Sequence, residues 1–143
     1  MLVSKNVWII YAAFSAIFAA LVGVFGKIGV KHIDSTLATT IRAVLMAVFL
    51  IVVAMGTHKF VAIKQLDSKA LIFLVLAGIA GALSWLAYFY ALQRGPLSGV
   101  AVIDRMSVVL AVVLGWTMFG EALTWKSAAG IVCMVAGLLL FIV

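Results

Sequence analysis

The sequence predicts an all-α integral membrane protein with five transmembrane helices, and three observations carry that prediction. Of the 143 residues, 68% are apolar and 10% are charged, and the mean hydropathy is +1.38. Soluble domains are about 45–50% apolar and about 25% charged, so a water-soluble fold of this size would expose too much apolar surface. The apolar residues also form long runs, without the alternation that a membrane barrel needs.

The helix positions follow from the lengths of these runs, because a helix needs about 20 apolar residues to cross the hydrocarbon core. Asp34, Asp67 and Thr124 can each cap the helix that follows, and Pro96 suits a first helical turn. The run after Lys5 is too long for a signal peptide, so we expect a retained first helix. The sequence thus predicts one transmembrane domain over residues 1–143, with spans at 7–30, 35–56, 69–93, 97–119 and 124–143.

The net charge of +6 comes from ten Lys and Arg against four Asp and Glu. The basic residues lie between the apolar runs, which is typical of membrane loops and does not indicate nucleic-acid binding. An odd number of spans places the termini on opposite sides of the membrane. The positive-inside rule favours a cytoplasmic N-terminus in a prokaryotic inner membrane, but by a margin that leaves dual topology open. The two sides carry Lys5, Lys59, Lys64, Lys69 and Lys126 against Lys27, Lys31 and Arg94.

Charged side chains inside a bilayer are costly, so each one is a candidate functional residue. Asp104 lies about eight residues into the fourth span, or about 12 Å along the helix, and Arg105 follows it directly. Arg42 lies at a similar depth in the second span, and Lys27 near the far end of the first. Because the spans alternate in direction, these four residues and Tyr88 are expected in the same half of the membrane.

Each charge also has a structural interpretation. Lys27 and Arg42 are long enough to extend toward the lipid headgroups. Asp104 is too short for that, so it either pairs with an arginine to fix helix packing or handles substrate or protons. A carboxyl group in apolar surroundings favours its protonated form, which makes Asp104 a candidate proton carrier. Asp104 and Arg105 are about a third of a turn apart, so either Asp104 faces a cavity and Arg105 a neighbouring helix or subunit, or the reverse.

The sequence lacks the residue patterns of an enzyme or a metal protein. It has no nucleophile with an adjacent base, no phosphate-binding loop and no paired carboxylates. His32 and His58 fall in loops on opposite sides of the membrane, and the single cysteine, Cys133, cannot form an internal disulfide. We therefore expect no catalytic activity, no cofactor and no bound metal.

Three stretches resemble the EamA-like family of the drug/metabolite transporter superfamily. They are Val102-Ile103-Asp104-Arg105-Met106-Ser107 in the fourth span, Phe119-Gly120-Glu121-Ala122-Leu123-Thr124 after it, and Tyr88-Phe89-Tyr90-Ala91-Leu92 at the end of the third. Arg42 fits the same pattern. The small, single-repeat members carry a Pro-Ile-Asp-Lys-Leu-Ser type stretch, from which this chain departs at Val102, Arg105 and Met106. Because Val102 stands where those members have proline, a break in the fourth helix at this point is less expected. Glu121, at the opposite end from the charges, is interpreted as a cap or turn contact.

The resemblance implies a secondary transporter of a small organic solute, a metabolite or drug, working by alternating access at a midplane site. Three basic residues against one acid favour a zwitterion or anion, while an organic cation stays open. A second copy would complete the transporter as a homodimer, parallel or antiparallel. The alternatives are a non-transporting membrane subunit and a carrier of membrane lipids. The candidate set for substrate or proton is Asp104, Arg105, Arg42, Trp85, Tyr88, Tyr11 and Ser107, with Lys27 in addition.

Overall fold

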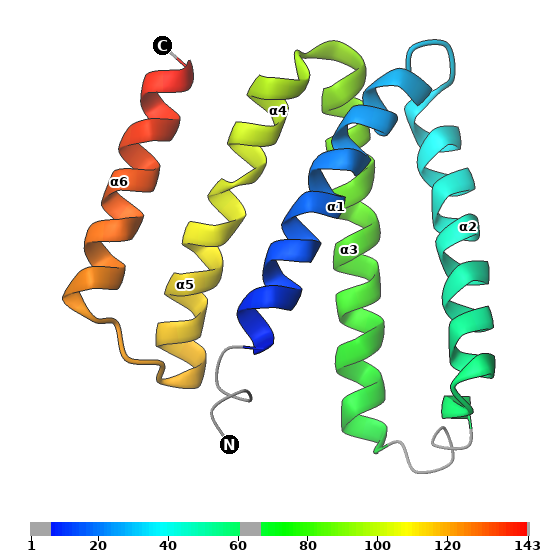
Figure 1. Cartoon of the computed structure of the whole chain (residues 1–143), viewed down its shortest axis with the longest axis horizontal. Coiled ribbons are helices and arrows are strands. Elements are labelled where there is room, and N and C mark those ends of the chain that lie inside the picture. The colour runs from blue at the N-terminus through cyan, green and yellow to red at the C-terminus, as the bar shows by residue number, and fades with distance from the viewer. Residues whose placement is uncertain (1–6, 61–66, 143) are drawn as a thin grey trace. The chain divides into compact units, whose positions relative to one another are not determined.

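A computed structural model describes residues 7–60 and 67–142, and within these ranges the regular structure is helical, with no strand. Four stretches, counting Leu97–Phe119 as one, are long and apolar enough to cross a membrane, and a shorter apolar helix follows them. The prediction of an all-α membrane protein is confirmed. The helices are α1 (Val7–Gly29), α2 (Ser35–Gly56), α3 (Ser68–Arg94), α4 (Leu97–Asp104), α5 (Met106–Phe119) and α6 (Trp125–Ile142) (Figure 1).

The chain divides into two compact units, Met1–Arg94 with α1 to α3 and Gly95–Val143 with α4 to α6. Within the first unit, α1 and α2 both pack on α3 (Figure 1). Within the second, α4 packs on α6 and α5 contacts both. Lys5 and Lys64, which enter the charge balance of the loops, lie outside the described residues.

The buried side chains of the first unit gather where α1 and α3 end and α2 begins. Val30 is 1% exposed, Leu92 0% and Phe89 4%. Gly26 allows this close approach, because a Cβ added there would lie 3.2 Å from Phe89 Cζ and 3.4 Å from Leu92 Cδ1. Thr39 is buried beside them, and its hydroxyl donates to the Ser35 carbonyl at 2.7 Å. The three helices are thus joined firmly at one end.

Hydrogen bonds from polar side chains also join α1, α2 and α3 at this same end of the first unit. Asp34 caps α2, accepting at Oδ1 from Thr36 N (2.9 Å) and Leu37 N (3.1 Å). The Lys27 ammonium donates to the Leu92 carbonyl in the last turn of α3, where backbone carbonyls lack helical partners. Gln93 Nε2 donates to the Ile33 carbonyl at 3.2 Å, which ties the α1–α2 turn to α3.

In the second unit a tight turn joins α5 to α6. Gly120 ends α5 in the left-handed conformation (φ 64°), and its N–H bonds to the Gly115 carbonyl. Glu121 N donates to the same carbonyl at 3.3 Å. A Cβ at Gly115 would lie 2.8 Å from Glu121 Oε2, so the carboxylate occupies space that the glycine leaves open. Thr124 begins the next helix by accepting from Ser127 N at 3.2 Å. Glu121 is therefore a turn contact.

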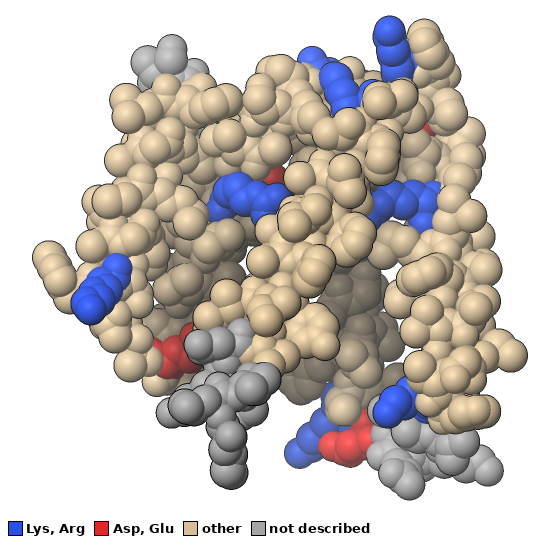
Figure 2. Space-filling view, in the orientation of Figure 1, with Lys and Arg blue, Asp and Glu red and all other residues tan. Residues whose placement is uncertain are grey.

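Most apolar side chains point away from their own unit. Trp125 is 86% exposed, Leu140 82% and Phe119 78%. On the face shown in Figure 2, the charged side chains form small separate groups on a surface made mostly of other residues. This is the inverse of a soluble domain, and it fits helices whose outer faces meet lipid or other helices.

The contact of Gly26 with Phe89 predicts a specific steric effect. Gly26→Val should lower the free energy of unfolding by about 1–3 kcal/mol, because the added methyl groups meet a ring that its neighbours hold in place. Gly29→Val is the matched control, since a Cβ at Gly29 meets nothing within 4 Å. Thermal unfolding of the purified protein in detergent measures both variants. Equal midpoints would contradict the packing described.

Candidate functional site

Arg42 of α2 is held against the aromatic side chains of α3. Its Cζ lies 3.5 Å from the centre of the Trp85 ring and 5.7 Å from the centre of the Phe89 ring. Arg42 is the eighth residue of α2, so it lies about 10 Å along the helix from Ser35. A cation over an aromatic face gains about 0.5–2 kcal/mol, more where water is excluded. The ring therefore stabilises a charge that apolar surroundings would otherwise disfavour.

The rings that support Arg42 contact one another. The centroid distances are 5.5 Å between Trp85 and Tyr88, 5.9 Å between Trp85 and Phe89, and 6.2 Å between Tyr88 and Phe89. The rings meet edge to face or tilted, which is the favourable geometry for aromatic pairs. Trp85 and Phe89 are four residues apart and therefore lie on one face of α3. The cluster forms a firm platform under the guanidinium.

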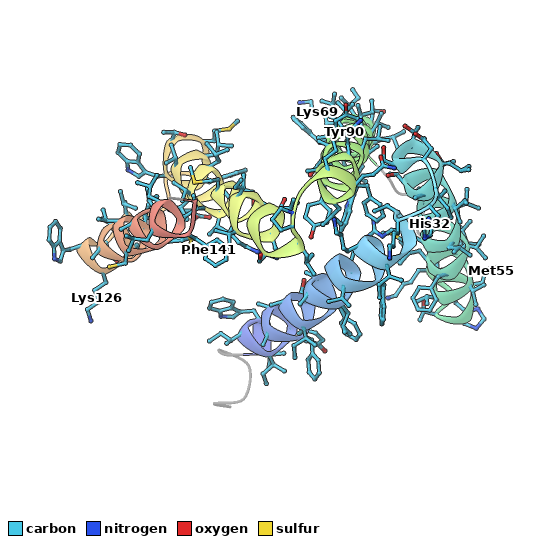
Figure 3. All side chains as sticks on the ribbon, turned by 90° about the horizontal axis from the view of Figure 1, so that it is seen from above. His32, Met55, Lys69, Tyr90, Lys126 and Phe141 are labelled. Atoms are coloured by element: carbon cyan, nitrogen blue, oxygen red, sulfur yellow. The ribbon has the colours of Figure 1, made fainter. Side chains whose placement is uncertain are left out.

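Arg42 and Phe89 line a groove of about 350 Å³ within the first unit. Its other walls come from α1, the α1–α2 turn and the start of α2, and these residues are apolar or glycine. Seen end-on, side chains of α1, α2 and α3 project between the three helices, while Lys126 projects outward from α6 (Figure 3). The remaining lining residues are Val22, Phe25, Gly26, Gly29, Ile33, Ala38 and Ile41.

The fourth span is interrupted beside its acidic residue. α4 ends at Asp104 and α5 begins at Met106, although no proline is present. Val108 N bonds to the Arg105 carbonyl (3.0 Å) and so leaves the Asp104 carbonyl without its usual helical donor. Ser107 Oγ donates to that carbonyl at 2.7 Å. A serine hydroxyl thus takes the place of a backbone N–H at this irregular turn, where Arg105 itself keeps right-handed helical dihedral angles (φ −66°, ψ −11°).

Arg105 and Asp104 differ in what they line. Arg105 lines a groove of about 240 Å³ with residues of α6, among them Gly137 and Phe141. Asp104 does not line this groove and is partly buried. Arg105 thus lies beside α6 within the second unit, while the cavity expected for one of the two residues stays a prediction.

The structure brings together only some of the expected site residues. Arg42, Trp85 and Tyr88 form one cluster, and Lys27 lies near the end of α1, where it lines a different pocket. Tyr11, in the first turns of α1, is 71% exposed and makes none of the ring contacts found in the described part of the chain.

Two residues of the site were absent from the predicted set. Phe89 is the buried ring beside Arg42, and Gly26 leaves the room that this ring occupies against α1. A signal for Phe89 exists in the sequence, since it follows Trp85 by one helical turn. Among residues 7–60 and 67–142, no three His, Cys, Asp or Glu side chains gather in a way that could hold a metal ion.

Four stretches of membrane-spanning length and apolar composition define a multi-pass membrane protein. The sequence matches the EamA-like transporter family over residues 6–143, and the chain belongs to that family. It is similar to a Sinorhizobium sp. protein described as "Uncharacterized transporter in cobO 3'region", with 37% identity over 136 residues. That alignment covers 95% of this chain and 96% of the relative. No solved structure matches the chain.

The stacking of Arg42 on Trp85 predicts coupled stabilities. Arg42→Gln and Trp85→Leu should each lower the unfolding free energy, while the double variant should lose about 0.5–2 kcal/mol less than the sum of the single losses. Denaturation in detergent measures the cycle. Arg94 and Tyr90 provide a comparison pair, because Arg94 Cζ also lies 3.5 Å from its ring centre. Purely additive losses for Arg42 and Trp85 would contradict a direct interaction.

Proposed function

We propose that this chain is a secondary transporter that moves a small organic solute by alternating access at a site near the membrane midplane. The observation that carries the proposal is the position of Arg42. It is a charged side chain within a span, held on Trp85, and it lines a groove that is otherwise apolar. Charges at such depth are retained in membrane proteins chiefly for substrate or ion pathways.

The chemistry of this groove supports an anionic or zwitterionic solute. Arg42 rests on a neutral ring rather than on a carboxylate, so its charge is not cancelled where the groove begins. Tyr88 extends the aromatic platform, and Lys27 adds positive charge near the end of α1. Tyr11 is assigned to the opposite end of the α1 surface, where solute would enter or leave.

The fourth span supplies the second part of the proposal. Interrupted helices form the substrate and ion sites of many secondary transporters, because the break exposes backbone groups to the cavity. We assign Asp104, at the break, to substrate or proton binding. Ser107 donates to the Asp104 carbonyl at this point, and we assign Arg105 to setting the local charge.

A homodimer in a prokaryotic inner membrane, with the N-terminus cytoplasmic in at least one copy, completes the proposal. A substrate cavity needs walls on every side, and each unit of this chain buries few of its own side chains. The five expected spans give an odd number, so two copies in opposite orientations would form an inverted pair. Two copies in the same orientation would follow the charge bias of the loops.

A lipid carrier is the second candidate, and one observation favours it. Arg105 lines a groove with apolar residues of α6, where an anionic headgroup and an acyl chain could both be accommodated. A non-transporting subunit is the third reading, in which the charges serve only assembly. Co-purified lipid that disappears in Arg105→Gln would favour the carrier. Loss of assembly in Asp104→Asn would favour the subunit.

Solute-evoked currents in liposomes test the transporter proposal. Under a pH gradient, a panel of amino acids, organic anions and organic cations should reveal a transported solute. Arg42→Gln should reduce its transport about tenfold or more, since a charge-assisted hydrogen bond is lost. Asp104→Asn should abolish proton-coupled current while leaving assembly intact. Arg94→Gln is the control, because Arg94 stacks on Tyr90 and does not line the groove. A panel without response, in currents and in tracer uptake alike, would contradict the proposal.

The oligomer is tested by mass and by labelling. We expect a protein mass in detergent of twice 15.2 kDa. In a Cys133→Ser background, Lys126→Cys reports the side of the membrane on which α6 begins. A membrane-impermeant maleimide that labels this cysteine from both sides indicates opposite orientations, and labelling from one side indicates a single one. A monomeric mass under mild extraction and in cross-linked membranes would contradict the homodimer.

A further inference from the structure

The stacking distance fixes how Arg42 presents its hydrogen-bond donors. Its Cζ lies 3.5 Å from the centre of the Trp85 ring. If the guanidinium stood on edge, a nitrogen bonded at about 1.3 Å would approach the ring to about 2.2 Å, which is well inside contact distance. The guanidinium therefore lies closer to parallel with the indole than on edge. One face is covered, and the N–H groups point outward in the plane of the stack.

Flat stacking leaves an edge that suits a particular partner. The N–H groups along one edge of a guanidinium match the two oxygens of a carboxylate and form a bidentate pair. The α2–α3 contact covers the face of Arg42, while the residue still lines the groove beside Phe89. A carboxylate in the groove would thus meet fixed donors, and little side-chain entropy would be lost on binding.

The other walls of the groove determine the rest of the ligand. Among the described residues that line it, Arg42 is the only charged one, and none is acidic. An ammonium group would find no carboxylate on these walls. A second negative charge would find no second cation, and an unpaired charge away from water is costly. The volume of about 350 Å³ lies near the lower end of the range of ligand pockets.

We propose that the groove binds a small monocarboxylate with an apolar body, whose carboxylate pairs edge-on with the stacked Arg42. This inference rests on the proposed function, in which the groove is part of a solute site, and narrows it from anions and zwitterions to one class. The carboxylate lies against the guanidinium edge. The apolar body lies along α1, over Gly29, where an added Cβ would meet nothing within 4 Å.

Four matched probes separate charge from size. Hexanoate, norleucine, hexylamine and adipate share a six-carbon chain and carry, in that order, one carboxylate, a carboxylate with an α-ammonium, an ammonium alone, and two carboxylates. Calorimetric titration of the full chain in lipid nanodiscs, with empty nanodiscs subtracted, measures each affinity. We expect hexanoate to bind about tenfold or more tightly than the other three.

Substitutions at Arg42, Arg94 and Trp85 distinguish a role of Arg42 in binding the carboxylate from a role in stabilising the fold. Arg42→Gln should weaken the binding of hexanoate about tenfold or more. Arg42→Lys should also weaken this binding, because lysine lacks the planar fork of arginine. Arg94→Gln, which removes the arginine stacked on Tyr90, should leave the hexanoate affinity unchanged. Thermal unfolding identifies any variant that is misfolded. In that case Trp85→Leu provides the second measurement. It frees the guanidinium without removing its charge, and it should weaken the binding of hexanoate.

The outcomes also separate this inference from the function on which it rests. If norleucine or adipate binds as tightly as hexanoate, in an Arg42-dependent way, the monocarboxylate assignment is wrong and the solute site stands. If the liposome currents identify a substrate that has no carboxylate but whose transport needs Arg42, the monocarboxylate assignment is again wrong and the solute site again stands. If no probe binds in an Arg42-dependent way and the liposomes are silent, both proposals fail.

Discussion

The low dielectric of the bilayer is the constraint on which the rest of this structure depends, because lipid offers backbone polar groups no hydrogen-bond partner. Long apolar helices satisfy most of these groups internally. At the ends and at the break, side chains satisfy the remainder. Asp34 accepts from the first N–H groups of α2, Lys27 donates to the Leu92 carbonyl, and Ser107 donates to the Asp104 carbonyl. These polar residues are placed where the helical ladder ends, rather than by any amphipathic pattern.

The same constraint acts on charge, and it explains why arginine and aromatic residues occur together. A cation in apolar surroundings must reach water, pair with an acid or rest on a polarisable ring. Arg42 rests on the Trp85 ring, and this stacking does not use the N–H groups along the edge of its guanidinium. A lysine at this position would carry its charge at a single point and would not stack flat. The aromatic cluster around Trp85 is therefore part of the electrostatics of the site and not only of its packing.

Run length predicted where the apolar helices lie, and α1, α2 and α3 begin and end within one residue of the expected bounds. The sequence also placed Arg42 and Asp104 within their spans. It did not pair Arg42 with Trp85, since helices that are apolar all round carry little information on which face meets a neighbour. The close packing of Gly26 against Phe89, which brings α1 onto α3, is likewise not recorded by hydropathy. The break at Arg105 was also missed, because a serine hydroxyl that competes for a backbone carbonyl is a weaker signal than proline.

Arg42 and Arg94 both stack on an aromatic ring, and comparing them shows why we propose a binding site at only one of them. Arg42 and Arg94 lie at the same distance, 3.5 Å, from the centres of Trp85 and Tyr90. Stacking alone therefore does not distinguish them. Arg94 ends α3, where the carbonyls of the last turn favour a cation. Arg42 lies within a span and not at a helix end, and the other residues that line its groove are apolar or glycine. A ligand oxygen could supply to Arg42 what the helix end supplies to Arg94, and the proposal of recognition at Arg42 rests on this difference.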